Sequence, residues 1–476
     1  MVYVLIFNTS LLIFRILYIL YYPTDLSPEE AQYWDWSRHL DLSYYSKPPM
    51  VAYLNFLMGK IFGISELAVR ISPVVLSFLL SIITYVFVRR IFGHRVAFIS
   101  STLPQITVGY AVNSLLMTTD APFVFFWSLS VMCLYEAMEK NDTKLWLLSG
   151  VLSGFAFLSK YPAVFLLPIT LTYMALSKRY LLKSLNPYFS LIPAFLLSFP
   201  VFVWNYMHNF VSFKHVSTLA SKSDNFFQPF YVLEFVGSQA VLLSVLPFIT
   251  LLYAWVKSFK NRNLLFFTFY SLPIFLFFLL LSFHKRVEAN WSGFAYFSGF
   301  ILISYFLSRS VLLLPTYFFS FLIFLFLHFT PLLDALGFGK FLPPEKDPTK
   351  FLVGWRSLAK RVDELYTGNE LVFSPQYQVS AELAFYMKGT PQTYCVNLGR
   401  RMNQYDLWKD GMKAYIGKDA IFVSVGPIQK RVLDAFDGII KEDIYRVFWR
   451  GKEVSVFYIY KLKNYRGLEE NLPMGY

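Results

Sequence analysis

Apolar stretches of about 20 residues recur along the chain, and no other feature constrains its fold as strongly. A helix of that length crosses a bilayer with every backbone polar group paired. Only 15% of the residues are charged and 56% are hydrophobic, whereas soluble domains carry about 25% charged residues. We therefore predict a polytopic α-helical membrane protein. We expect about eleven transmembrane helices, near residues 2–22, 66–88, 96–116, 121–138, 145–159, 161–177, 187–206, 231–256, 264–283, 291–308 and 311–330.

Basic residues mark the ends of these spans. Lys and Arg outnumber Asp and Glu by 43 to 30, which gives a net charge of +13. The positive-inside rule places basic turns such as 89–95, 178–183 and 257–262 in the cytoplasm, together with the N-terminus. An odd number of spans puts the C-terminal tail outside, and an even number would leave it inside. Because the charge follows topology, we expect a bilayer as partner and no nucleic acid.

The last part of the chain has the pattern of a soluble domain. Helical periodicity at 351–365 is followed by strand-like runs at 370–374, 420–425 and 454–460. The proline-rich segment 343–348 is typical of a linker. We therefore predict a transmembrane domain, 1–344, and a soluble α/β domain on the extracytoplasmic side, 345–476.

A polar, aromatic loop follows the first span. Its sequence is SPEEAQYWDWSRHLDLSYYSKPP (27–49), within a predicted external catalytic loop at 23–65. Glu29 and Glu30 are candidates to accept a proton, and Lys47 offers a point charge for a phosphate. Aromatic side chains in the same loop offer faces for sugar stacking, and the candidates are Tyr33, Tyr44 and Tyr45.

The same segment also has a structural interpretation. Ser27 can cap a helix that begins at Pro28, and two acids in its first turn then complement the helix dipole. Adjacent residues on a helix point about 100° apart, so only one of the two acids faces a given site. The aromatic neighbours and Lys47 favour the catalytic interpretation.

Three further charged residues stand in or beside apolar spans. They are Asp120, Lys160 and Arg70. A charge at the centre of a membrane helix costs about 2.5–3.5 kcal/mol, so charged residues at this depth usually line a cavity. Structural alternatives stay open for each. Asp120 can cap the next helix, Lys160 can snorkel to the headgroups, and Arg70 can pair with Glu66 one helical turn away.

The segment HKRVEANW (284–291) gathers charge on the predicted outer side. Basic residues there oppose the positive-inside pattern, so Arg286 and its neighbours suggest an anionic ligand, either a phosphate or a lipid headgroup. Glu288 and Asn290 add polar groups suited to a sugar or an acceptor. Headgroup binding with no catalytic role is the alternative.

The loop at 27–54 resembles the first external loop of the GT-C membrane glycosyltransferases of the protein mannosyltransferase superfamily. The resemblance spans essentially the whole chain and is nearest the bacterial branch of lipid A aminoarabinose and galacturonic acid transferases. Further segments match in order and spacing: SELAVRISP (65–73), LMTTDAPFVFFW (116–127), LSKYPAVFLLP (158–168), WNYMHNFVSF (204–213), HKRVEANW (284–291) and QVSAELAFYMKGTPQTYCVNLGRRMNQYDLW (378–408).

This resemblance implies an inverting transfer of one sugar from a polyprenyl-phosphate donor to a lipid or glycan acceptor. It implies a monomer in the bacterial inner membrane with its active site in the periplasm. Glu29 matches an acid that is usually Asp, which implies that Glu29 is the general base or orients the acceptor hydroxyl. Its extra methylene leaves Glu30 and Asp120 as alternatives. Lys47 matches the lysine that contacts the donor phosphate.

Other roles follow from the resemblance by position. Lys160, Arg70 and Arg286 fall where contacts to the donor phosphate or headgroup are expected. The spacing of His and Cys predicts no metal site. Some relatives use a divalent metal held by paired acids, so a possible divalent metal remains an open alternative.

Two other functions compete with this interpretation. A protein O-glycosyltransferase of the same superfamily would share the donor but not the acceptor. A transporter or flippase for an anionic amphiphile would use the same intramembrane charges. A scaffold without activity is a third possibility. The large polar loop and the lack of evident repeats favour a transferase.

Overall fold

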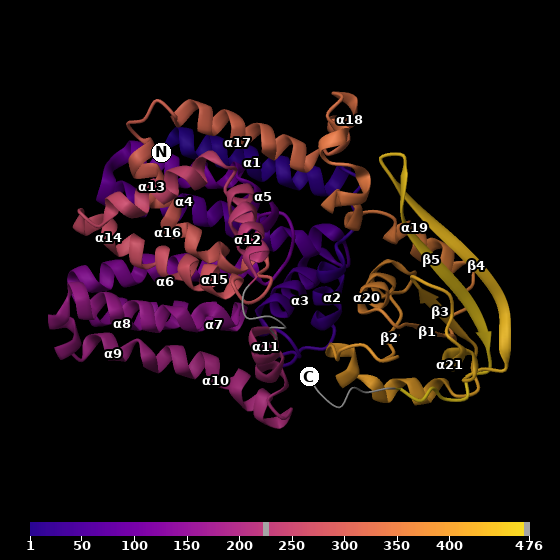
Figure 1. The fold of residues 1–476 in the computed structure, drawn as a ribbon. Coiled ribbons are helices and arrows are strands. Elements are labelled where there is room, and N and C mark those ends of the chain that lie inside the picture. Colours follow the sequence, from indigo (N-terminus) through magenta and orange to yellow (C-terminus); the bar gives the residue numbers. More distant parts are fainter. Residues whose placement is uncertain (222–227, 471–476) are drawn as a thin grey trace.

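The chain folds into a body of helices with a sheet unit at one end (Figure 1). The computed structural model describes residues 1–221 and 228–470. Five helical segments within this range are long and apolar enough to cross a membrane. They are α1 (Val2–Tyr21), α4 (Glu66–Thr102) with η1 (Pro104–Ile106), α6 (Asp120–Lys140), α9 (Asn186–Phe189) with α10 (Leu191–Met207), and α14 (Arg262–Phe269) with α15 (Leu272–Ser282).

Shorter helices complete the body. They are α5 (Val108–Asn113), α7 (Thr143–Ser159), η2 (Tyr161–Phe165), α8 (Leu166–Ser177), η3 (Arg179–Lys183), α11 (Val211–Ser221), η4 (Ala289–Ala295), α16 (Tyr296–Leu307) and α17 (Leu313–His328). The polytopic helical class is confirmed, but the number of about eleven spans is not.

The predicted span at 231–256 is wrong as a single helix. Two helices, α12 (Pro229–Leu242) and α13 (Leu246–Ser258), meet there at a bend of 106°. Ser244 and Val245 have positive φ angles of 64° and 56° at the bend. Pro247 lies in the first turn of α13, where its missing N–H costs no hydrogen bond of that helix, but a proline there could not continue α12. The predicted span at 96–116 also divides, into the end of α4, η1 at Pro104 and α5.

The segment predicted as an external loop at 23–65 contains two helices. The first, α2 (Pro28–Ser37), begins as the sequence predicts. The Ser27 hydroxyl accepts from the backbone N–H of Glu30, and the Glu30 carboxylate accepts from the backbone N–H of Ser27. The second, α3 (Met50–Phe62), is apolar and ends at Gly63 with φ of 72°. The loop with Lys47 is therefore held between two helices.

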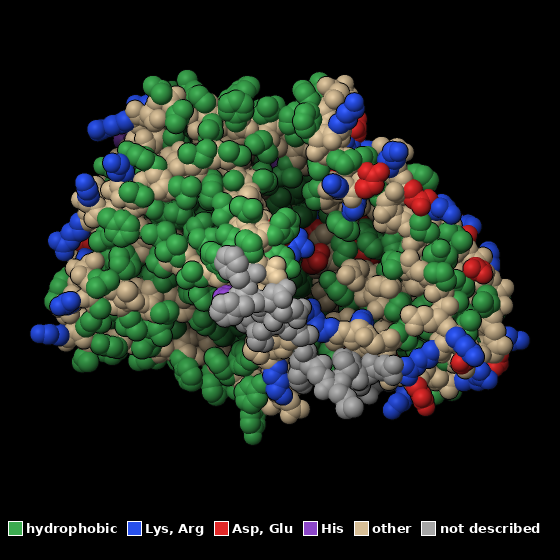
Figure 2. Space-filling view, viewed as in Figure 1, with side chains coloured by type: hydrophobic (Ala, Val, Ile, Leu, Met, Phe, Trp, Pro, Cys, Tyr) green, Lys and Arg blue, Asp and Glu red, His purple; other side chains and the backbone are tan. Residues whose placement is uncertain are grey.

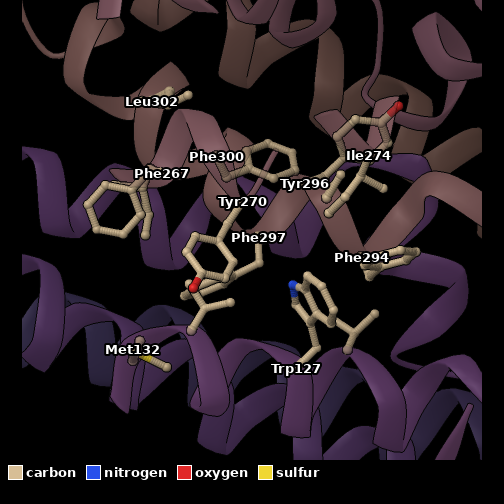
Figure 3. Packing of buried hydrophobic residues seen from close by; sticks show 14 of the residues in the cluster. Trp127, Met132, Phe267, Tyr270, Ile274, Phe294, Tyr296, Phe297, Phe300 and Leu302 are labelled. Carbon is tan, nitrogen blue, oxygen red and sulfur yellow. The ribbon is translucent and has the colours of Figure 1, made fainter. Parts of the chain in front are cut away.

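Aromatic side chains from α6, α14, α15, η4 and α16 fill the core of the helical body (Figure 3). The ring of Phe294 in η4 lies 4.6 Å from Trp127 and 5.1 Å from Phe123, both in α6. Such edge-to-face pairs restrict how two helices can slide. This packing fixes the start of α6, at Asp120, beside the start of η4, where Asn290 lies.

The C-terminal unit is a five-stranded sheet with helices, as the α/β prediction requires. The strand order is β2-β1-β3-β5-β4, with β1 parallel to β2 and β3, and β5 antiparallel to β3 and β4. The predicted strands coincide with β1 (Leu371–Ser374), β3 (Ala420–Ser424) and β5 (Lys452–Lys463). Sequence patterns missed β2 (Thr393–Cys395) and β4 (Gly438–Trp449).

The helices of this unit are α19 (Trp355–Asp363), α20 (Tyr377–Tyr386), η8 (Gln404–Leu407), η9 (Lys409–Tyr415) and α21 (Lys430–Leu433). Short turns connect it to the helical body: α18 (Pro331–Ala335), η5 (Gly339–Phe341), η6 (Pro344–Lys346) and η7 (Pro348–Leu352).

Polar and aromatic contacts join the C-terminal unit to the segment with α2. The Asp25 carboxylate accepts from the backbone N–H of Trp355 at 2.8 Å. The Tyr405 hydroxyl donates to Asp35 at 2.7 Å. Trp34 packs edge-on against Phe385 of α20, with ring centroids 4.9 Å apart. The C-terminal unit therefore holds α2 in place.

Candidate active site

A cavity of about 900 Å³ lies between the helical body and the C-terminal unit. Figure 2 shows the hollow on the surface, with acidic and basic side chains at its opening. Helices α1, α5 and α17, the start of α2, and the C-terminal unit all contribute to its walls. Eight residues predicted from the sequence line it: Glu29, Tyr33, Tyr45, Lys47, Asp120, Lys160, Glu288 and Asn290.

Glu29 lies in the first turn of α2 and lines this cavity. Its side chain is exposed, and no side chain among the described residues forms a hydrogen bond or ion pair with it. Desolvation by the surrounding protein raises the pKa of the carboxyl, whereas a hydrogen bond from its own backbone N–H lowers it. The charge of Glu30 raises the pKa further, and Lys47 lowers it. A free carboxylate with a raised pKa has the properties of a general base.

Asp120 starts α6, and two side chains bind its two oxygens. Lys160 donates to Oδ1 at 2.6 Å, and Asn290 donates to Oδ2 at 2.7 Å. Lys160 is buried, so it does not snorkel to the membrane surface but pairs with Asp120 inside the cavity. These contacts fix the orientation of the Asp120 carboxylate and leave Glu29 as the less constrained acid.

Lys47 lies in the loop between α2 and α3 and lines the same cavity. Within the described residues, its ammonium group has no hydrogen bond or ion pair. Burial lowers its pKa to about 8, and the nearby Lys160 lowers it as well, whereas Asp120 and Glu29 oppose the shift. A desolvated ammonium without a partner is a suitable contact for a phosphate.

Three comparisons place this cavity among known proteins. Residues 46–204 match a family described as dolichyl-phosphate-mannose-protein mannosyltransferase. The chain is 25% identical over 296 residues to the lipid A galacturonosyltransferase RgtD of Rhizobium johnstonii, covering 61% of this chain and 62% of RgtD. It is also 25% identical to the undecaprenyl phosphate-alpha-4-amino-4-deoxy-L-arabinose arabinosyl transferase 2 of Proteus mirabilis, covering 53% and 50%. The matched regions thus span less than two thirds of these relatives.

The fold comparison covers nearly the whole chain. The crystal structure of ArnT from Cupriavidus metallidurans superposes with a TM-score of 0.69 at 14% identity, over 96% of this chain and 97% of ArnT. A second ArnT structure, bound to undecaprenyl phosphate, gives the same score. The chain therefore has the fold of ArnT. In sequence it resembles the protein mannosyltransferase family over residues 46–204, and it also resembles RgtD and the Proteus mirabilis arabinosyl transferase.

Four predicted residues lie outside the cavity, and two of them form a buried pair. Arg70 donates to Glu30 through Nε at 2.9 Å and through Nη2 at 2.8 Å. Both side chains are almost fully buried. The alternative pairing of Arg70 with Glu66 is also wrong, because Glu66 pairs with Arg356. Glu30 and Arg70 are structural in this arrangement and do not reach a ligand in the cavity.

Tyr44 and Arg286 also point elsewhere. Tyr44 is fully buried, stacks on Trp36 at 4.5 Å, and donates to the backbone carbonyl oxygens of Trp36 and His39. Its ring is therefore not available to a sugar. The Arg286 guanidinium is exposed and pairs with Glu234 at 2.7 Å. The anionic ligand suggested by the HKRVEANW segment would have to meet Asn290 or Trp291, which do line the cavity.

Sequence reasoning missed the part of the cavity that the C-terminal unit supplies. Tyr377, Gln378, Arg401 and Asn403 line it from that side, and His215 lines it from α11. One signal was visible, because Gln378, Arg401 and Asn403 fall within the segment 378–408 that resembles the family. In the described part of the chain, no group of three or more His, Cys, Asp or Glu side chains is placed to hold a metal ion.

Proposed function

We propose that this chain is an inverting glycosyltransferase of the bacterial inner membrane. It would transfer a single sugar from a polyprenyl-phosphate donor to a lipid A-like or other cell-envelope acceptor. The observation that carries the proposal is the meeting of Glu29, Lys47 and Asp120 in one cavity beside membrane helices. The names of RgtD and the Proteus mirabilis relative, both sugar transferases, support the reaction class.

The cavity residues fit a single displacement. Glu29 takes the proton of the acceptor hydroxyl as its oxygen forms a bond to the anomeric carbon of the sugar. The bond from that carbon to the phosphate oxygen breaks, and the phosphate of the carrier gains one negative charge. Lys47 stabilises the charge that develops there. Asp120, held by Lys160 and Asn290, is placed to orient the sugar or the hydroxyl.

The apolar part of the cavity suits a lipid tail. Leu115, Leu116 and Leu327 line it, and all three belong to the helical body. A prenyl chain that enters here would lie beside α5 and α17 while its phosphate stays near Lys47. The ArnT structure bound to undecaprenyl phosphate supports a carrier of this kind.

We also propose how the chain is oriented in the membrane. Residues 1–344 form the transmembrane part, and 345–476 form a periplasmic unit that closes the cavity. The basic turns at 89–95 and 178–183 support a cytoplasmic N-terminus. With the C-terminal unit on the other side of the membrane, the chain must cross it an odd number of times.

A direct assay tests this function. The purified full-length chain, in lipid nanodiscs, is mixed with a panel of polyprenyl-phosphate sugars and with lipid A or a peptide acceptor. Mass spectrometry is expected to detect a single added sugar on the lipid. Transfer to the peptide alone would support a protein O-glycosyltransferase instead. Transport of the donor across a vesicle membrane without transfer would contradict the proposal.

The Lys47→Ala variant is expected to weaken binding of undecaprenyl phosphate by about tenfold to 100-fold. This range corresponds to the ~1.5–3 kcal/mol of one charge-assisted hydrogen bond. Binding is measured with the purified chain by microscale thermophoresis. The matched control is Lys60→Ala, because Lys60 lies exposed on α3 over the Phe56 ring. A larger effect of Lys47→Ala on acceptor binding than on carrier binding would contradict the assigned role.

The pH dependence of kcat/KM is expected to be bell-shaped. Glu29 must be deprotonated to act as base, so activity rises as the pH passes its raised pKa. Lys47 must carry its charge, so activity falls as the pH rises through about 8. Arginine stays charged throughout this range. The Lys47→Arg variant should therefore lose the alkaline limb, and an unchanged limb would assign it to another group.

A further inference from the structure

One loop of the C-terminal unit places the positively charged side chain of Arg401 at the cavity. Residues 401–403 line the same cavity as the loop with Lys47. The Arg401 side chain is exposed, and within residues 1–221 and 228–470 it makes no hydrogen bond or ion pair. Arg401 is thus an unpaired guanidinium in a cavity that already contains the unpaired ammonium of Lys47.

The neighbouring side chains hold the backbone of this loop rigidly. The Arg400 guanidinium donates to Asp406 at 2.8 and 3.3 Å and to the backbone carbonyl oxygen of Pro375 at 3.1 Å. Asn403 and Asp406 form a reciprocal cap at the start of η8. Adjacent arginines thus have opposite roles, because Arg400 builds the loop and Arg401 is left for the cavity.

The loop is also attached to the loop with Lys47. The Gln404 side chain accepts from the backbone N–H of Tyr45 at 2.6 Å. Met402 and Leu407 pack against a small cluster of Tyr45, Trp204 and Val211. Because Tyr45 is two residues from Lys47, and Gln404 three residues from Arg401, this attachment brings the two cations to the same end of the cavity.

The charges of both cations act on the His215 ring. This ring lies 4.9 Å from that of Tyr45. Burial, together with the charges of Arg401 and Lys47, lowers the pKa of His215 to about 4. His215 is therefore neutral at ordinary pH and offers no negative charge to either cation. Two like charges close together repel each other, and an anion bound between them would reduce that repulsion.

We propose that the loop at 399–406 is an anion-recognition loop, in which Arg401 binds a phosphate group in the same cavity as Lys47. This inference rests on the proposed function for the source of the phosphate, which is either the donor carrier or a phosphorylated acceptor lipid. A planar guanidinium binds two oxygens of one phosphate, whereas the ammonium of Lys47 acts as a point charge. The C-terminal unit would then take part in binding rather than only cover the cavity.

Two arms of one experiment separate the sources. The full-length Arg401→Ala variant is tested for binding of undecaprenyl phosphate and, at saturating donor, for the KM of lipid A and of dephosphorylated lipid A. A donor contact predicts a tenfold or greater loss of carrier binding with an unchanged acceptor KM. An acceptor contact predicts a tenfold or greater rise of the KM for lipid A, and none for the dephosphorylated lipid. In whichever measurement changes, the value for Arg401→Lys should lie between those of the wild type and Arg401→Ala. Lysine keeps the positive charge but loses the two-pronged hydrogen bonding of the guanidinium.

The matched control is Arg431→Ala, since Arg431 lies on α21 outside the cavity. The unfolding midpoint of Arg401→Ala should equal that of the wild type. The inference is overturned if Arg401→Ala changes neither carrier binding nor the acceptor KM by more than twofold while Glu29→Gln abolishes transfer. If the wild type transfers no sugar, the proposed function fails, and carrier binding alone decides whether the loop recognises phosphate.

Discussion

Replacing Glu29 by Gln is expected to lower kcat by about 10²–10⁴-fold, the usual contribution of a general base. Gln has nearly the same size and keeps its place in the first turn of α2, but it cannot take a proton. In the part of the chain that the structure describes, Glu29 has no side-chain partner that the change would break, and Ser27 and Glu30 form the cap of this helix. The variant should therefore fold normally and bind undecaprenyl phosphate as the wild type does.

The measurement is single-turnover transfer with the purified chain, with binding and thermal unfolding followed in parallel. Asp120→Asn is the informative comparison, because both Asp120 oxygens are engaged by Lys160 and Asn290. It should reduce activity but keep the acid limb of the pH profile, whereas Glu29→Gln should remove that limb. Transfer by Glu29→Gln at the wild-type rate would assign the base to another residue.

The different positions of Glu29, in the cavity, and Glu30, in a buried ion pair, show how much the sequence alone predicts. The helix start at Ser27 and Pro28 was predictable from local capping chemistry, and the structure confirms it. Adjacent acids in one turn must face different directions, so the sequence also predicts that only one faces a given site. Which one does so depends on Arg70, which comes from another helix and binds Glu30. That contact is tertiary and leaves no local pattern.

The residues of the cavity also divide into those that the sequence predicts and those that only the fold brings together. Charges that interrupt apolar spans, such as Asp120 and Lys160, were visible because membrane depth makes them costly. Arg401 was not singled out, because an arginine in a soluble segment is ordinary until the fold brings it into the same cavity as Lys47. The bend between α12 and α13 had a signal in Pro247, yet the apolar run on both sides of it resembled one span.

The buried pair of Glu30 and Arg70 holds the start of α2 against α4. Glu30 accepts from Arg70, from the backbone N–H of Met117 at 3.0 Å, and from the backbone N–H of Ser27 at 2.9 Å. Arg70 also donates to the backbone carbonyl oxygen of Asp25 at 2.7 Å. Removing one partner of such a pair leaves the other charge buried without its counter-ion, which typically costs about 3–5 kcal/mol.

The Arg70→Met variant is therefore expected to lose about 3–5 kcal/mol of stability, together with activity, because Glu29 is attached to the helix start that Glu30 holds. Thermal unfolding in detergent, followed by tryptophan fluorescence, measures the loss. Glu136→Gln is the control, since Glu136 pairs with the exposed Lys140, and exposed pairs contribute about 0–1 kcal/mol. Combining Arg70→Met with Glu30→Leu should recover part of the stability, because the buried charge disappears with its partner. An unfolding midpoint of Arg70→Met equal to that of the control would mean that other contacts hold α2 against α4.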